Sequence, residues 1–130
     1  MKIHTALAAT MMGGLALGVV ATKALHAQGK PPAYIVIDIR EMTDPEGFKT
    51  ILTNPAASPA GIASLGGHYV IRTEDAVALE GIKPKRLIVI AFENTEKAQA
   101  WYNAPAVKEI NAIRARTTKS NTFIVEGVAN

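Results

Sequence analysis

The segment RLIVIAF, residues 86–92, most constrains what this chain can fold into. Every residue after Arg86 is apolar, and the segment has the length of a typical β-strand. A strand with one face in water alternates between apolar and polar residues, whereas a strand covered on both faces reads as a continuous apolar run. We therefore predict that residues 86–92 form a central strand of a sheet.

Three other segments are predicted strands whose two faces differ. In residues 33–39 (AYIVIDI), isoleucine occupies alternate positions, which produces one apolar and one mixed face. Residues 68–72 (HYVIR) and residues 121–128 (NTFIVEGV) are also rich in β-branched and aromatic side chains. Together with residues 86–92, they make four strands.

Helices are predicted in the two longer segments between strands. The first begins with Asp44 as its N-cap and Pro45 at its first position, and Pro55 breaks it. The glycine pair at residues 66–67 ends it, because a left-handed C-cap is easily adopted only by glycine. The second helical region begins at Asn94 or Thr95, and a proline at position 105 interrupts it and restarts it.

The resulting order of elements is β-α-β-β-α-β. This order is typical of the ferredoxin-like α+β fold, in which a four-stranded antiparallel sheet carries both helices on one face. We expect one domain of this fold, since 130 residues leave little room for a second.

The face of the sheet without helices needs another cover. Alternation assigns these side chains to the helix-covered face: Ile35, Ile37, Ile39, Tyr69, Ile71, Phe123 and Val125. It assigns these to the open face: Tyr34, Val36, Asp38, His68, Val70, Arg72, Thr122, Ile124 and Glu126. About half of the second set is apolar, and a monomer would expose it as a large patch. We expect a homodimer in which two sheets pack face to face.

Residues 1–27 have the features of a secretory signal peptide. Lys2 precedes an uncharged apolar stretch, residues 6–22, and the sequence ALHA ends at Ala27. We predict cleavage after Ala27 and a periplasmic or secreted location. The mature chain would then consist of a proline-containing linker, residues 28–32, and a domain, residues 33–128.

The alternative is an uncleaved membrane anchor formed by residues 6–22. Leu25 is larger than the small residue usual near a cleavage site, and Lys23 lies late in the segment. The stretch is shorter than the ~20 apolar residues that span a bilayer comfortably, which favours cleavage. Membrane association is expected only in the uncleaved form.

Composition excludes several classes of site. The chain has no cysteine, and its three histidines are scattered, so we expect no disulfide, thiolate nucleophile or metal centre. Two of the 14 basic residues, Lys2 and Lys23, lie in the signal segment, so 12 remain against 11 acidic residues and the net charge falls from +3 to +1. Nucleic-acid binding is therefore not expected. No glycine-rich phosphate loop or serine elbow is present, and we expect no cofactor.

Several segments resemble the bacterial family called domain of unknown function 1330. They are AYIVIDIREMTDPEGFK, LGGHYVIRTEDAVALEG, PKRLIVIAFENTEKAQAWYNAPAVKEI and TFIVEGV, which together run from about residue 33 to residue 128. The family is similar to the dimeric α/β-barrel proteins, a superfamily with small monooxygenases, dehalogenase-like enzymes and binding proteins. The resemblance implies the ferredoxin-like fold and a dimer, and it implies no activity. This chain differs at His68, where members often carry arginine or lysine.

The polar side chains expected on the open face are the candidate ligand-binding residues. They are Tyr34, Asp38, His68, Arg72 and Glu126. Arg72 would bind a carboxylate or another anion, and His68 would act as an acid or base near neutral pH. The alternative is that Asp38 and Arg72 form an interface ion pair and that His68 is only hydrogen-bonded there. Arg114, near the end of the last helix, is expected to interact favourably with the helix dipole.

Three functions are compatible with this sequence. The leading hypothesis is a periplasmic dimer that binds a small organic molecule, with an anion favoured by Arg72, between the sheet and the partner subunit. The second is a cofactor-independent enzyme of the monooxygenase or isomerase kind with His68 as its acid or base. The third is a structural dimer without a ligand.

Signal cleavage can be tested by the mass of the exported protein. We predict that protein from the periplasmic fraction begins at Gln28, and intact-mass measurement checks this. Ala27→Leu should retain the precursor, because a bulky residue just before the cut blocks the peptidase. Wild-type chain that keeps Met1 in the membrane fraction would contradict the prediction and support the anchor.

Overall fold

The computed structural model describes residues 31–129, and Pro32–Gly127 forms one compact unit. The elements are β1 (Ala33–Met42), α2 (Pro45–Leu52), η1 (Pro55–Ala57), α3 (Pro59–Ser64), β2 (Gly67–Thr73), β3 (Arg86–Phe92), α4 (Thr95–Asn103), α5 (Pro105–Thr117) and β4 (Thr118–Glu126). The predictions for residues 1–27, and for residues 28–30 of the linker, lie outside the described residues.

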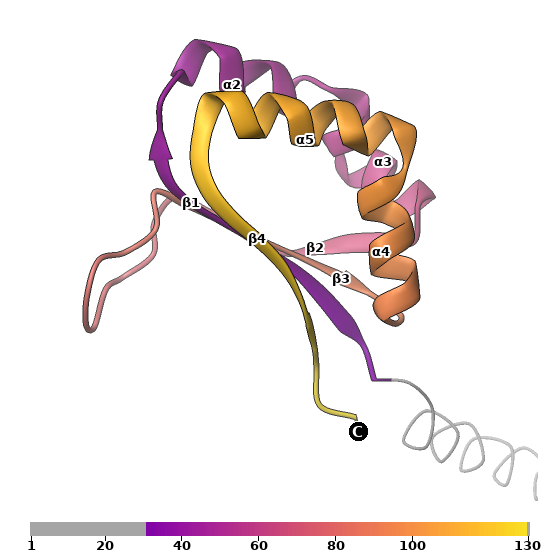
Figure 1. Cartoon of the computed structure of the whole chain (residues 1–130). Coiled ribbons are helices and arrows are strands. Elements are labelled where there is room, and N and C mark those ends of the chain that lie inside the picture. The colour runs from indigo at the N-terminus through magenta and orange to yellow at the C-terminus, as the bar shows by residue number, and fades with distance from the viewer. Residues whose placement is uncertain (1–30, 130) are drawn as a thin grey trace, which may run out of the picture. The chain divides into compact units, whose positions relative to one another are not determined.

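The strands form a four-stranded antiparallel sheet in the order β2-β3-β1-β4, and the helices cover one of its faces (Figure 1). The predicted ferredoxin-like α+β architecture is confirmed. The apolar run at residues 86–92 is β3, which lies between β2 and β1, so its predicted central position in the sheet is confirmed. None of the helices within residues 31–129 is long and apolar enough to cross a membrane.

Side-chain caps and prolines divide the helical layer into short pieces. Asp44 accepts a hydrogen bond from the Gly47 amide at 3.0 Å and so caps α2, as predicted. Ser58 caps α3 in the same way, and Asn94 caps α4 by accepting from the Lys97 amide at 2.9 Å. The interruption expected at proline 105 is the boundary between α4 and α5.

The core lies between the sheet and the helices. The isoleucines of β1 at positions 35, 37 and 39 are buried there, together with Ile90 of β3. From the helical layer they meet Phe48, Ile62, Trp101, Val107, Ile110 and Ile113. The Phe92 and Trp101 rings pack at 5.6 Å between centroids, which joins the end of β3 to the last turn of α4 in the core.

The facing predicted for β4 is wrong by one residue. Phe123 pairs with Val36 and Val125 pairs with Tyr34, so both lie on the open face. Thr122 and Ile124 pair instead with buried isoleucines of β1 and lie on the helix-covered face. The cause is that β4 has apolar side chains on both faces, so alternation alone leaves the register open, and pairing with β1 decides it.

The facing predicted for the end of β2 is also wrong. Tyr69 lies on the helix-covered face as expected, but the register shifts between Tyr69 and Ile71. Ile71 therefore pairs with Val89 on the open face, and Arg72 pairs with Ile88 on the helix-covered face. A bulge inserts one extra residue into the strand, so every side chain after it points to the face opposite the one that simple alternation predicts.

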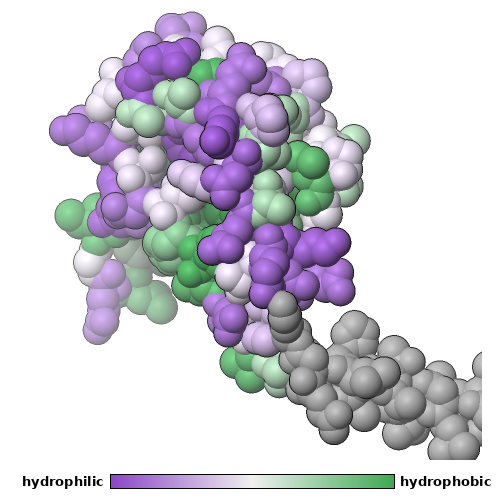
Figure 2. All heavy atoms as spheres, turned by 45° about the vertical axis from the view of Figure 1, so that its right-hand side comes forward, coloured by the Kyte–Doolittle hydropathy of each residue, from purple (hydrophilic) through white to green (hydrophobic). Residues whose placement is uncertain are grey.

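These corrections make the open face more apolar than expected. Its apolar members include Val36, Ile71, Val89, Phe123 and Val125. Phe123 keeps 47% of its surface exposed, and Ile71 and Val125 are also exposed. Figure 2 shows strongly hydrophobic spheres toward the lower left of the domain, next to hydrophilic spheres that cover much of the rest of this view.

A long loop, residues 74–85, connects β2 to β3 and extends away from the sheet (Figure 1). Val77, Leu79 and Ile82 in this loop are 83%, 92% and 85% exposed. Isolated exposed apolar residues are ordinary, but three within six positions of one projecting loop form an apolar tip.

Gly67, at the start of β2, lies against side chains of the core. A Cβ at this position would lie 2.7 Å from Phe92 Cε2 and 3.0 Å from Ile90 Cγ2. We expect Gly67→Ala to lower the free energy of unfolding by about 1–3 kcal/mol, because buried side chains would have to move. Urea unfolding measures this. Ala60→Ser, on the exposed side of α3, should change it by less than about 0.5 kcal/mol. An unchanged midpoint for Gly67→Ala would contradict the packing described.

Candidate functional site

The structure does not bring the predicted site residues together within one chain. Tyr34, Asp38 and His68 lie on the open face, as expected. Asp38 pairs with Leu87 and His68 pairs with Ala91, four positions apart on β3. Asp38 and His68 are therefore separated by about 13 Å along the strand direction alone.

Asp38 interacts with a different arginine from the one expected. Its Oδ2 accepts from Arg40 Nη1 at 3.2 Å, and its Oδ1 is buried with no hydrogen-bond partner within residues 31–129. The expected ion pair between Asp38 and Arg72 cannot form, because the bulge in β2 places Arg72 on the other face of the sheet.

Glu126 also lies away from the open face. It pairs with Ala33 on the helix-covered side, and its Oε1 accepts from Thr95 Oγ1 at 3.2 Å. The prediction that Arg72 and Glu126 share the open face is therefore wrong for both residues, since both strands have a register that alternation did not reveal.

A groove at the β4 edge has the composition of a binding site. It encloses about 540 Å³ between the end of α4, the second half of α5 and β4. Its lining residues are mostly polar: Arg40, Tyr102, Asn111, Arg114, Ala115, Thr118, Lys119, Ser120, Asn121 and Thr122. None of them is acidic, and three are cationic. The groove is therefore suited to a negatively charged group.

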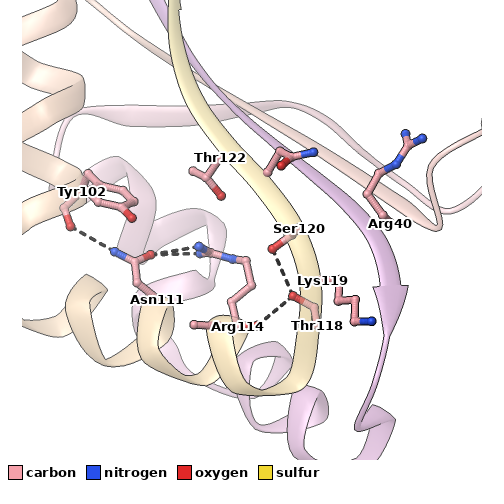
Figure 3. Close-up of a pocket in the computed structure, with 10 residues that line it drawn as sticks. Arg40, Tyr102, Asn111, Arg114, Thr118, Lys119, Ser120 and Thr122 are labelled. Carbon is pink, nitrogen blue, oxygen red and sulfur yellow. Dashed lines mark hydrogen bonds between the residues drawn. The ribbon is translucent and has the colours of Figure 1, made fainter.

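Arg114 is the central residue of the groove. It projects from α5 and is only 6% exposed (Figure 3). Its Nη1 and Nη2 both donate to Asn111 Oδ1 at 3.1 Å, and Asn111 Nδ2 donates to the Tyr102 carbonyl at 3.2 Å. Asn111 is thus fixed by α4 and in turn fixes the guanidinium, which is set in place before any ligand arrives.

The charge of Arg114 has no anionic partner in the described part of the chain. Burial lowers the pKa of its guanidinium, and the interactions with Tyr102 and Tyr69 act in the opposite direction. An arginine nevertheless stays charged at any physiological pH. Nη1 and Nη2 of Arg114 each donate one hydrogen bond to Asn111. The other N–H groups of the guanidinium remain available to a ligand.

Hydroxyl groups and two further cations surround Arg114. Thr118 Oγ1 donates to the Arg114 carbonyl at 2.7 Å and lies 3.1 Å from Ser120 Oγ. Figure 3 shows Ser120 and Thr122 along β4 beside Arg114, with Arg40 and Lys119 on the other side of that strand. The other two cations of the groove are paired, Arg40 with Asp38 and Lys119 with Glu41 at 3.5 Å.

This arrangement can bind an oxyanion. A buried, oriented guanidinium recognises carboxylate or phosphate through two parallel hydrogen bonds, and hydroxyls can donate to the remaining oxygens. Neither His68 nor any carboxylate lines the groove. Within residues 31–129, no three acidic or histidine side chains are placed to hold a metal ion.

Sequence reasoning missed Arg114 as a site residue and interpreted it through the helix dipole. One signal could have found it. Arg114 follows Ile110 by four positions, so it shares the face of α5 that Ile110 buries. A charged residue on the apolar face of a helix is costly without a partner, and it therefore indicates a functional or structural role.

Comparisons with known proteins agree with the fold. The protein RPA0582 from Rhodopseudomonas palustris, of unknown function, superposes with a TM-score of 0.57 at 14% identity over 76% of this chain and 84% of that one. A dimeric ferredoxin-like protein of unknown function from Thermobifida fusca gives 0.53 at 14% identity over 75% and 92% of the two chains. SnoaB, a cofactor-independent oxygenase from Streptomyces nogalater, gives 0.52 at 11% identity over 75% and 93%.

At such identities the likeness shows a shared fold only. No curated protein sequence matches the chain. A match over residues 32–128 to the family described as Domain of unknown function (DUF1330) covers nearly all of the residues that the structure describes. The segments quoted from the sequence thus carried a correct resemblance, and this chain belongs to the DUF1330 family.

Proposed function

We propose that this DUF1330 protein is a homodimer that binds a small organic anion in the groove beside Arg114. The observation that carries the proposal is the buried, oriented Arg114 guanidinium without a carboxylate partner in the described chain. The proposed site therefore differs from the one expected between the sheet and a partner subunit. A periplasmic or secreted location is proposed from the signal-like residues 1–27 alone.

The charge of Arg114 supports an anion over a neutral ligand. A buried cation without a counter-ion is destabilising, and an arriving carboxylate or phosphate would remove that cost while forming charge-assisted hydrogen bonds. A volume of about 540 Å³ lies within the ~300–1,000 Å³ of typical small-molecule pockets. The groove is polar and open, which favours a hydrophilic anion with hydroxyl or further acidic groups.

An enzymatic role with His68 as the acid or base receives no support from this groove. His68 lies exposed on the open face, near Tyr34, and at the opposite end of the sheet order from β4. The oxygenase SnoaB shares the fold at 11% identity, and a shared fold does not carry an activity with it.

The open face supports the homodimer. Its apolar side chains, with Phe123 and Val125 exposed, would leave a large patch in water on a monomer. A second copy supplies the same apolar surface in return, as a two-fold interface requires. The structurally similar T. fusca protein is described as dimeric, which supports this proposal.

Anion binding can be tested with inorganic phosphate and succinate as probes. We expect the purified protein to bind at least one of them in calorimetric titration, and Arg114→Lys to weaken that binding about tenfold or more, since lysine cannot form the two parallel bonds. Arg116→Lys, an exposed cation on the same helix, is the matched control and should bind within about twofold of wild type.

The result also has to be separated from unfolding. Arg114→Met replaces the buried cation with an unbranched apolar side chain and should keep or raise stability while abolishing binding. Absence of binding by both probes, or equal binding by wild type and Arg114→Lys, would contradict the proposed site.

The dimer can be tested by light scattering at micromolar concentration. We expect twice the monomer mass for the wild-type protein and the monomer mass for Phe123→Glu, because a charge would be buried within the apolar face. Ala60→Glu adds the same charge on the exposed side of α3 and should remain dimeric. A monomeric wild type, or a dimeric Phe123→Glu, would contradict sheet-to-sheet packing.

A further inference from the structure

A second cavity lies at the other edge of the sheet from the Arg114 groove. It encloses about 250 Å³ between α2, η1 and the strands β2 and β3, on the helix-covered side. β2 and β4 are the two edge strands, so this cavity and the groove are separated by the width of the sheet. Most of its lining is apolar, and two guanidinium groups, those of Arg72 and Arg86, also line it.

Arg72 reaches this cavity because of the bulge in β2, which turns it toward Ile88 on the helix-covered face. Its guanidinium carbon lies 4.5 Å from the centre of the Tyr69 ring. The Tyr69 hydroxyl donates to the Ala57 carbonyl, which holds the ring in place. A guanidinium held over an aromatic ring by a cation–π interaction can still donate its N–H groups to an acceptor. Within the described chain, Arg72 has no carboxylate partner.

Arg86 is the second cation of the cavity and is more deeply buried. Its side chain is 14% exposed, and its Nη1 donates to Glu74 Oε1 at 3.1 Å. Its Nε is buried and has no hydrogen-bond partner within residues 31–129. A buried donor without an acceptor is rare and costly, so a further acceptor is expected beside it.

We propose that this cavity binds a short-chain monocarboxylate. The carboxylate would accept from Arg72 and from Arg86, whose two positive charges face one acidic residue, Glu74. The hydrocarbon chain would pack against Phe48, Ile51 and Ile88, which line the same cavity. The volume is below the ~300–1,000 Å³ of pockets for drug-sized ligands, which limits the ligand to a small one.

This proposal is independent of anion binding beside Arg114. The two sites differ in chemistry, because hydroxyls surround Arg114 whereas apolar side chains surround Arg72 and Arg86. The groove therefore suits a hydrophilic anion, and the second cavity suits an acid with an apolar chain. Each site can be altered without touching the other.

The test uses hexanoate, with hexanamide as its neutral counterpart, in calorimetric titration of the purified protein. We expect hexanoate to bind at least about tenfold more tightly than hexanamide, since a hydrogen bond to a charged group contributes ~1.5–3 kcal/mol. Arg72→Gln removes the positive charge but keeps a polar side chain, and it should weaken hexanoate binding by about tenfold or more.

Two control variants locate the binding. Lys49→Gln removes an exposed charge from α2, close to the cavity, and should bind hexanoate within about twofold of wild type. Arg114→Lys should do the same, which would show that hexanoate occupies the second cavity and not the groove. No binding of hexanoate, equal binding of hexanamide, unchanged binding by Arg72→Gln, or loss of binding in Arg114→Lys would each overturn the proposal.

Discussion

The packing of all helices on one face of the sheet is the constraint on which the rest of this structure depends. The buried isoleucines of β1, with Ile90 of β3, hold α2, α4 and α5 against that face. The helical layer cannot also cover the opposite face, so the side chains there must meet water or another molecule. Because Phe123 and its neighbours on that face are apolar, the same packing that forms the core also favours a partner for the sheet.

Arginine side chains line a cavity at each edge of the sheet, between the edge strand and the helical layer. At one edge, Arg114 lies on the buried side of α5, and its guanidinium donates to Asn111 Oδ1. At the other edge, the guanidinium carbons of Arg72 and Arg86 lie over aromatic rings, at 4.5 Å from the centre of Tyr69 and 6.0 Å from the centre of Phe48. Arg114 is buried without an anionic partner, and the buried Nε of Arg86 lacks an acceptor within residues 31–129, which is why both proposed ligands are anions. The two edges differ mainly in what surrounds the charge, hydroxyls in one case and hydrocarbon in the other.

The elements could be predicted because their signals are local. The continuous apolar run of β3, the caps at Asp44 and Asn94 and the break at Pro105 all depend on neighbouring residues, and the structure confirms each one. The candidate site could be predicted only in part. His68 lies on the expected face, whereas Arg72 lies on the opposite one and pairs with Ile88. A bulge is set by hydrogen bonding between strands, and nothing in HYVIR distinguishes a regular strand from a bulged one.

The sequence by itself therefore determined the order of elements and the ferredoxin-like fold, because spacing along the chain encodes them. Its quoted segments also carried the resemblance to the family. Only the tertiary structure decided which side chains share a face or a cavity. The register of β4 against β1 places Phe123, and not Thr122, on the open face. The packing of α5 buries Arg114. Both depend on residues far apart in the chain, and a shift of one residue in a strand reverses every side chain after it.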